Sequence, residues 1–225
     1  MKIVSVLGSP RGTKGNTAAL LKLVLEGAES RGAETEVVVI RGQEVKPCKA
    51  CHVCHQTGVC PQKDGFNVLK DKALAADALV LACPNYIFHV SAQLKAFLDR
   101  CGGLLHTQAL EGKYGAAVVT SGGGEEEPIA DYLNQFLARA GARPVGSVWA
   151  TMGNIPGQDF PQAIRQQALA LGEKLVAAWQ NQETAPRFEA DAAQFRERMR
   201  SLMLWRKDEW PYEYEYWKKH RGLKA

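Results

Sequence analysis

Residues 3–15 read IVSVLGSPRGTKG, and this stretch decides how the rest of the chain is interpreted. The apolar run at 3–7 predicts a strand that is buried on both faces, because no polar alternation marks a solvated side. A glycine-rich loop follows it and leads into a helix predicted over 16–31, which Gly32 closes. A buried strand, a glycine-rich loop and a helix in this order indicate an α/β fold.

The same order of strand and helix repeats along the chain. Strands are predicted at 3–7, 35–40, 77–83, 115–120 and 145–151, and helices at 16–31, 66–75, 90–100, 128–140 and 160–179. Five strands buried on both faces and joined by helices predict a doubly wound parallel sheet with right-handed crossovers. Such a sheet places ligands beyond the carboxyl ends of its strands, here in the loops after Leu7, Cys83 and Thr120.

The tail of the chain differs in composition from the α/β part. We therefore divide the chain into a domain over 1–182 and a C-terminal arm over 183–225. A helical pattern begins near Ala185, and residues 210–217 read WPYEYEYW. An arm this rich in aromatic residues has no core of its own, so it must pack on this domain or on a neighbouring subunit. We expect subunit contacts, and packing on its own domain explains the arm about as well.

Composition excludes several classes of function. The chain has 225 residues, of which 46% are hydrophobic, enough for a full core. Its 28 basic and 24 acidic side chains form no concentrated basic face, so no nucleic-acid partner is expected. Apolar runs fall far short of the roughly eighteen residues that span a bilayer, and no signal peptide is evident. The sequence therefore predicts a cytoplasmic protein without a membrane partner.

A compact run of cysteines carries the strongest chemical signal, and it comprises Cys48, Cys51, Cys54 and Cys60. Three thiolates at intervals of three, and a fourth after a short loop, can converge on one [4Fe-4S] cluster. Structural zinc usually gathers two separated pairs of ligands, although His52 and His55 offer spare donors. The alternatives of zinc and of reduced or redox-active thiols stay open at this stage. Cys83 and Cys101 are expected to be buried thiols.

The first loop has the character of a phosphate site. Backbone N–H groups at the start of a helix favour an anion, and the loop departs from both the Walker and the Rossmann spacing. An ordinary Gly-Ser turn is the alternative interpretation. We expect a single phosphate to contact Ser9, Arg11, Asn16 and Thr17.

Two further loops have the residues that a flat tricyclic ring requires. Such a ring needs a close backbone approach, amide donors and an apolar or aromatic wall. Three successive glycines after the strand at 115–120 are hard to explain by packing, because each weakens local structure unless another body approaches closely. Together with the phosphate loop, these features predict bound FMN. The ring is expected to contact Pro84, Asn85, Tyr86, Ile87, Ser121, Gly122 and Gly123.

Three motifs together resemble one known family. These are GSPR with GNT in residues 8–17, the PNY loop leading to QLKAFLDR in residues 84–100, and the cysteine run. In these features the chain resembles the iron-sulfur flavoproteins, which belong to the flavodoxin-like NAD(P)H-dependent FMN reductases. The resemblance covers residues 1 to about 180, and the aromatic tail also resembles the family's C-terminal arm.

The resemblance implies a strand order of 2-1-3-4-5 and an oligomer, a homodimer or homotetramer, in which the cluster of one subunit lies near the flavin of another. It implies an oxidoreductase in which FMN exchanges electrons with a [4Fe-4S] cluster. The redox partner would be a ferredoxin-like protein or NAD(P)H, together with a small-molecule acceptor. An NAD(P)H-dependent FMN or quinone reductase without a cluster, and a zinc-stapled binding module, are the alternatives. No side chain is assigned as a general acid or base, because the cofactor carries flavin chemistry.

Overall fold

The computed structural model describes residues 1–41 and 44–224. Its strands are β1 Lys2–Leu7, β2 Glu34–Val39, β3 Ala78–Tyr86, β4 His89–Val90, β5 Tyr114–Ser121 and β6 Arg143–Thr151. Its longer helices are α1 Asn16–Glu29, α3 Phe66–Ala75, α4 Ala92–Arg100, α6 Glu126–Arg139, α7 Gln162–Gln180, α8 Pro186–Trp205 and α9 Pro211–Arg221. Shorter helical turns are η1 Gly12–Lys14, α2 Val53–Thr57, α5 Gly102–Thr107 and η2 Met152–Asn154.

The sheet has the predicted architecture. Its strands follow the order β2-β1-β3-β5-β6 and all pair in parallel, while the two-residue β4 adds an antiparallel hairpin to β3. Because β4 is so short, the five long strands correspond to the predicted order 2-1-3-4-5. The flavodoxin-like doubly wound fold is therefore confirmed.

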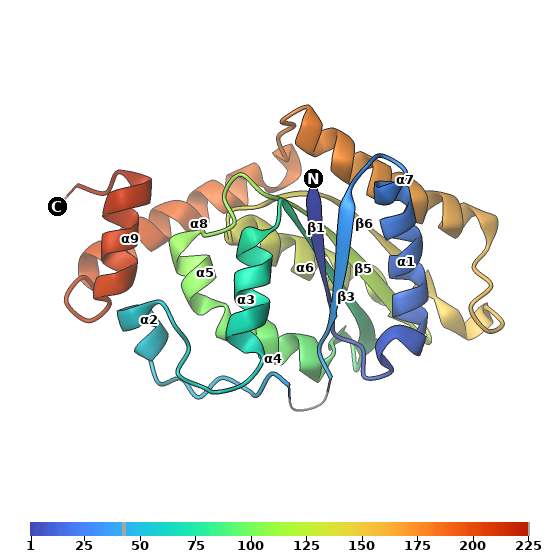
Figure 1. Cartoon of the computed structure of the whole chain (residues 1–225), viewed down its shortest axis with the longest axis horizontal. Helices are drawn as coiled ribbons and strands as arrows, with labels where there is room; N and C mark the ends of the chain where they lie inside the picture. The colour runs from blue at the N-terminus through green and yellow to red at the C-terminus, as the bar shows by residue number, and fades with distance from the viewer. Residues whose placement is uncertain (42–43, 225) are drawn as a thin grey trace.

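Helices cover both faces of the sheet (Figure 1). Successive side chains of β1 alternate between two cores: Ile3 belongs to the core under α1 and α7, and Val4 to the core under α3, α4 and α6. Helices α1 and α7 approach closely, since a Cβ at Gly172 would lie 1.9 Å from the carbonyl oxygen of Val24. The two layers of helices leave the carboxyl edge of the sheet free to carry loops.

The C-terminal arm forms two helices, α8 and α9, that extend to one end of the molecule (Figure 1). Trp217 is 2% exposed and its indole N–H donates to the carbonyl oxygen of His106 at 2.8 Å. It packs in a small core of its own with Met199, Met203 and Leu223. The arm therefore packs on the α/β part of the same chain, while the prediction of subunit contacts stays open. Within the described residues, none of the helices has the length and apolar character needed to cross a membrane.

The structure contains short elements that the sequence did not predict, among them α2, α5 and the β4 hairpin. The predicted helix at 90–100 begins later, at Ala92, because Val90 pairs in β4 and Ser91 caps the helix by accepting from the N–H of Leu94. Each added element is too short to display a hydrophobic period. Two of them, α2 and α5, lie beside the cysteine run and become part of its surroundings.

Candidate functional site

The three loops predicted to bind FMN meet at the carboxyl ends of β1, β3 and β5, which are neighbours in the sheet. Three direct bonds join them. The N–H of Gly8 donates to the carbonyl oxygen of Ala82 at 2.8 Å, and the amide of Asn85 donates to the carbonyl oxygen of Gly124 at 2.9 Å. The hydroxyls of Thr17 and Thr120 lie 2.6 Å apart. The loops thus form one connected surface, as a site at this edge of the sheet requires.

The first loop leads directly into the amino end of α1. Its N-cap is Gly15, which offers no side chain to satisfy the N–H groups of the first turn, so these remain suited to an anion. Arg11 is exposed beside them, whereas Ser9 and Thr17 are buried. Asn16 is the first residue of the helix, and its side-chain oxygen lies 3.4 Å from the Gln158 amide nitrogen.

The glycine loop after β5 presents bare backbone. A Cβ built at Gly122 or Gly123 would meet no atom of the described chain within 4 Å. Behind it, the Ser121 hydroxyl accepts from the N–H of Gly124 at 2.7 Å and donates to the carboxylate of Glu126. Glu126 is 5% exposed and also accepts from the hydroxyl of Thr151 at 2.6 Å. A buried carboxylate at the start of α6 therefore fixes the loop, a role that sequence reasoning missed.

The proline-aromatic loop continues β3 and turns back at β4. Pro84 and Asn85 are half-buried, while Tyr86 is 46% and Ile87 90% exposed. Ile87 and Phe88 form the two-residue turn with φ of 49° and 62°, a conformation that costs non-glycine residues energy. Among the described residues the Asn85 side-chain oxygen is buried without a hydrogen-bond partner. This orphaned acceptor, together with the open glycine backbone, fits a ring with polar edges.

The four cysteines of the run line one cavity of about 280 Å³. Ala50 and His52, the residues on either side of Cys51, have φ of 49° and 60°. These left-handed turns cost roughly 1–3 kcal/mol each and persist where surrounding structure imposes them. The strained backbone turns the chain repeatedly within seven residues, so that thiols three positions apart reach the same cavity. The donor set therefore fits a metal or cluster that prefers soft ligands.

Hydrogen bonds reach two of these sulfurs. The N–H of Ala50 donates to Cys48 Sγ at 3.4 Å, and the Arg100 guanidinium donates to Cys60 Sγ at 3.1 Å. Such bonds are a normal feature of iron-sulfur sites. Arg100 is held by Asp64 in a buried ion pair, with side chains 1% and 4% exposed. Burial alone would raise the pKa of Asp64, but bonds from Arg100 and two backbone N–H groups outweigh it and lower the pKa to about 2.

Burial makes Cys54, Cys83 and Cys101 harder to ionise. Burial raises the pKa of the Cys54 thiol to about 11, and the nearby charges of Glu213 and the other cysteines of the run add to the effect. A metal that binds here must therefore displace a proton from Cys54. Cys83 and Cys101 are 0% and 1% exposed and lie outside the cysteine cavity, as predicted for buried thiols. Burial raises the pKa of both, that of Cys83 to about 12.

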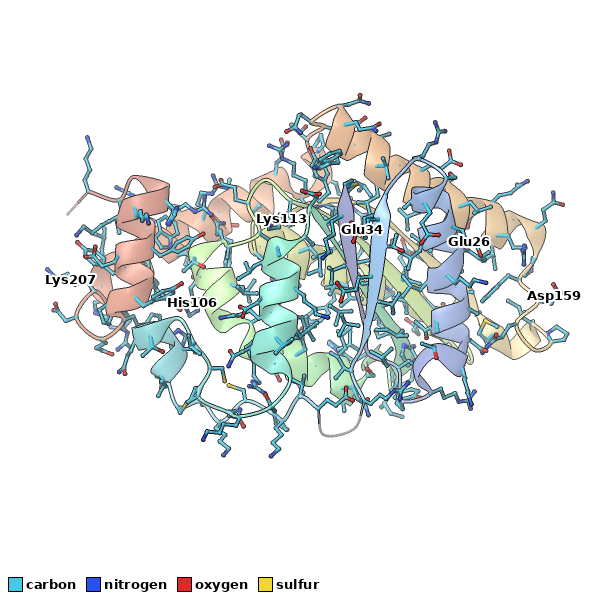
Figure 2. The ribbon with its side chains drawn as sticks, in the orientation of Figure 1. Glu26, Glu34, His106, Lys113, Asp159 and Lys207 are labelled. Atoms are coloured by element: carbon cyan, nitrogen blue, oxygen red, sulfur yellow. The ribbon has the colours of Figure 1, made fainter. Side chains whose placement is uncertain are left out.

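A cluster of His55, His106 and Glu213 lies beside the cysteine cavity. The position of His106 in the molecule is marked in Figure 2. Each Glu213 carboxylate oxygen accepts from one histidine, at 2.7 Å from His55 Nδ1 and 2.9 Å from His106 Nδ1. Burial favours the neutral carboxyl, but the two histidines outweigh it and keep the pKa of Glu213 low. The sequence singled out His55 as a spare ligand and gave no sign of its partner 158 residues away.

Comparisons with known proteins agree with the geometry. Residues 1–157 match the protein family described as NADPH-dependent FMN reductase. An Archaeoglobus fulgidus protein named iron-sulfur flavoprotein is 37% identical over 182 residues, covering 80% of this chain and 81% of its own length. An NAD(P)H dehydrogenase (quinone) of Cupriavidus metallidurans is 33% identical over 128 residues, 56% of this chain and 62% of that one. A solved flavodoxin from the Archaea shares the fold, with a TM-score of 0.51 at 18% identity over 80% of this chain and 99% of its own.

Proposed function

The chain belongs to the NADPH-dependent FMN reductase family and, within it, to the iron-sulfur flavoproteins, and from this membership we propose that it passes electrons between FMN and one [4Fe-4S] cluster. The family membership by itself makes it a flavin-dependent oxidoreductase. The observation that carries the finer proposal is the convergence of Cys48, Cys51, Cys54 and Cys60 on one cavity.

When bound, FMN supplies two-electron and one-electron chemistry, and the cluster supplies one-electron transfer. The chain's own residues bind and orient these groups. The amino end of α1 and Arg11 would hold the phosphate, and the bare backbone of Gly122 and Gly123 would lie against the ring. Glu126 keeps that backbone in place through Ser121.

The cysteine loop would hold the cluster with four thiolates. Arg100 lies behind Cys60 and donates an N–H group to its sulfur, a contact that orients this ligand. Asp64 keeps the guanidinium in that position with two hydrogen bonds, at most 2.9 Å long. Both residues are buried, so solvent does not compete for these contacts.

The quinone reductase relative supports one alternative, a reductase that uses NAD(P)H and FMN without a cluster. A zinc-stapled flavodoxin-like binding module is a second. The three hypotheses differ in what the cysteine cavity holds, so the metal, sulfide and FMN content of the purified protein separates them. Iron with acid-labile sulfide supports the proposal, zinc supports the module, and FMN without metal supports the plain reductase.

The experiment compares wild type with Cys54→Ser and Cys101→Ser, all purified without oxygen and reconstituted with iron and sulfide. Replacing a soft ligand with a hard one in Cys54→Ser should remove most of the iron and the broad absorbance that dithionite bleaches, while FMN stays bound. The matched control, Cys101→Ser, should keep its iron because Cys101 lies outside the cavity. Wild type that takes up only zinc, or no metal, would overturn the proposal.

The partners belong to the same proposal. We propose a ferredoxin-like protein or NAD(P)H as redox partner, a small-molecule acceptor, and a homodimer or homotetramer. Mixing the loaded protein anaerobically with NADPH, NADH or a reduced ferredoxin, and following the flavin absorbance, identifies the donor. Reduction by none of the three would remove these donors from the proposal.

A further inference from the structure

Glu213 is the most completely enclosed carboxylate of the arm, with 0% exposure. It lies in the first turn of α9 and uses both of its oxygens, one for each of two histidines. These histidines come from different elements: His55 directly follows Cys54 on α2, and His106 lies on α5. One side chain of the arm thus joins two segments that border the cysteine cavity.

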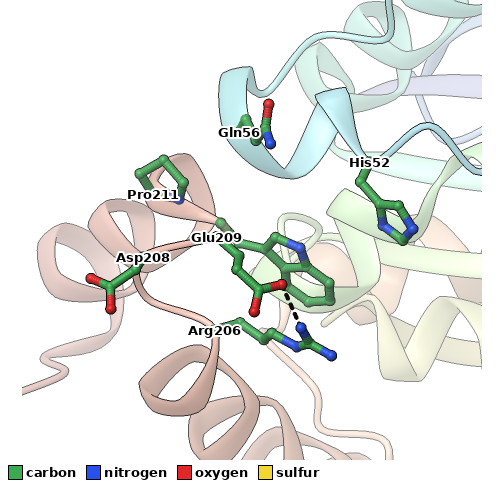
Figure 3. A pocket seen from close by; sticks show the side chains of 7 residues that line it. His52, Gln56, Arg206, Asp208, Glu209 and Pro211 are labelled. Carbon is green, nitrogen blue, oxygen red and sulfur yellow. Dashed lines mark hydrogen bonds and ion pairs between the residues drawn. The ribbon is translucent and has the colours of Figure 1, made fainter.

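Trp210 reinforces this junction from the side. Its indole stacks on His55 with ring centres 4.3 Å apart and on His106 at 5.2 Å. The loop that carries it faces α2 across a hollow lined by His52, Gln56, Arg206 and Glu209, with an Arg206–Glu209 ion pair on its arm side (Figure 3). Aromatic stacking over both rings restricts their rotation and so keeps each Nδ1 directed at Glu213.

The arm also covers the segment between the third and fourth cysteines. A Cβ at Gly58 would lie 2.4 Å from the ring of Tyr212, so the ring rests directly on the backbone there. Gly58 ends α2 with a φ of 75°, a conformation that glycine adopts readily. The path of the chain from Cys54 to Cys60 therefore follows the surface that the arm provides.

The same three side chains resemble the His₂Glu donor set of a mononuclear zinc site. Their spacing argues against it. Two ligands of one tetrahedral zinc lie about 3.3 Å apart, given metal–ligand bonds near 2.0 Å. The separations of 2.7 and 2.9 Å between histidine nitrogen and carboxylate oxygen are hydrogen-bond distances instead. The cluster is a clamp made of hydrogen bonds.

We propose that Glu213 is a positioning residue of the cysteine site: by holding His55 and His106 together it fixes α2, and with it Cys54, so that the cavity binds its metal tightly only when the C-terminal arm is docked. The proposal rests on the proposed function for the identity of the metal as a [4Fe-4S] cluster. Groups that hold ligands in place typically contribute about 10- to 100-fold to metal affinity. The effect should fall on the cysteine site alone, since FMN is expected on other loops.

The test compares Glu213→Ala, the isosteric Glu213→Gln and the control Glu215→Gln, which changes an exposed arm residue that pairs with Lys218. Two measurements are made on each variant: iron and sulfide per chain after anaerobic reconstitution, and the thiolate-to-cobalt absorption band as Co²⁺ is added to reduced, metal-free protein. Glu213→Ala should lose most of its iron and bind Co²⁺ at least tenfold more weakly. Glu213→Gln, which keeps one acceptor oxygen, should recover part of both.

FMN content and the far-ultraviolet circular dichroism should match wild type in all three variants. Iron retention and Co²⁺ binding at wild-type levels in Glu213→Ala would overturn the positioning role. So would a loss of FMN in step with the loss of metal, since that would mark general unfolding. If wild type binds Co²⁺ but never assembles iron and sulfide, the proposed function fails, while the Co²⁺ comparison still decides the role of Glu213.

Discussion

The hydroxyls of Thr17 and Thr120 share a hydrogen bond of 2.6 Å across the carboxyl edge of the sheet. Thr17 lies in the first turn of α1 and Thr120 near the end of β5, so this bond joins the phosphate loop to the glycine loop. Both residues are buried, at 2% and 3% exposure. The expected phosphate and ring subsites are therefore coupled, and substitutions should separate their contributions.

Removing the phosphate contacts should weaken FMN and leave riboflavin unaffected. In Arg11→Ala one charge-assisted bond to the phosphate is lost, worth roughly 1.5–3 kcal/mol, or about 10- to 100-fold in affinity. Fluorescence titration of both ligands measures this. Lys22→Ala, an exposed change farther along α1, is the control. Equal weakening of FMN and riboflavin would contradict the phosphate assignment.

Loss of the Glu126 carboxylate should act on the ring subsite. Glu126→Ala leaves the hydroxyls of Ser121 and Thr151 without their shared acceptor, so the glycine loop loses its support. We expect FMN and riboflavin to weaken together, each by about tenfold or more, which corresponds to roughly 1–3 kcal/mol for a lost buried partner. Isothermal titration with both ligands measures the effect, and the neighbouring exposed Glu127→Ala serves as the control. A selective loss of FMN would contradict it.

The Arg100–Asp64 pair should make stability depend on pH. Because the folded-state pKa of Asp64 lies near 2, below its ordinary 3.8, the pair contributes its full stability above about pH 3.8 and loses it as the pH falls through 2. Asp64→Asn leaves Arg100 buried without its counter-charge and should cost about 3–5 kcal/mol near neutral pH. Urea unfolding from pH 7 to pH 2 tests both points. The difference between wild type and variant should shrink below pH 4, and a constant difference would contradict the linkage.

Trp205 is our candidate for a subunit contact of the arm. It is 72% exposed at the end of α8, and Leu204 beside it is 38% exposed, whereas Trp217 is enclosed within the chain. Trp205→Glu should therefore lower the mass in light scattering without changing the thermal transition of the folded chain by more than a few degrees. An unchanged mass would assign the arm to its own domain alone.

Sequence reasoning predicted the sheet and its strand order because long, continuous apolar strands and amphipathic helices display their period locally. The bounds of α3 were predicted to the residue, and those of α1, α4, α6 and α7 within a few residues, whereas α9 was not predicted as a helix. The two-residue β4 and the single-turn helices α2 and α5 display no such period. Their formation depends on left-handed residues such as His52 and Gln108, whose backbone conformation no composition rule reveals.

The residues of the candidate site also fall into a predictable and an unpredictable group. Residues that would touch a ligand are recognisable from their motifs, and the structure brings their loops together. Supporting residues such as Glu126, Asp64 and Glu213 were missed, because each acts through a contact with a side chain distant in the sequence or hidden beneath a loop. An acidic residue in a sequence is expected to be exposed to solvent, and only the structure shows that these three side chains are buried.

The junction between Glu213 and His55 also bears on when the cysteine site can form. The ribosome builds the chain from its amino end, so the four thiols emerge long before the carboxylate 158 residues beyond His55. Until α9 has been made and docked, the thiols stay in a loop that lacks its clamp. Metal loading would then have to follow the completion of translation, and a chain cut short before the arm would be left with unprotected thiols open to oxidation.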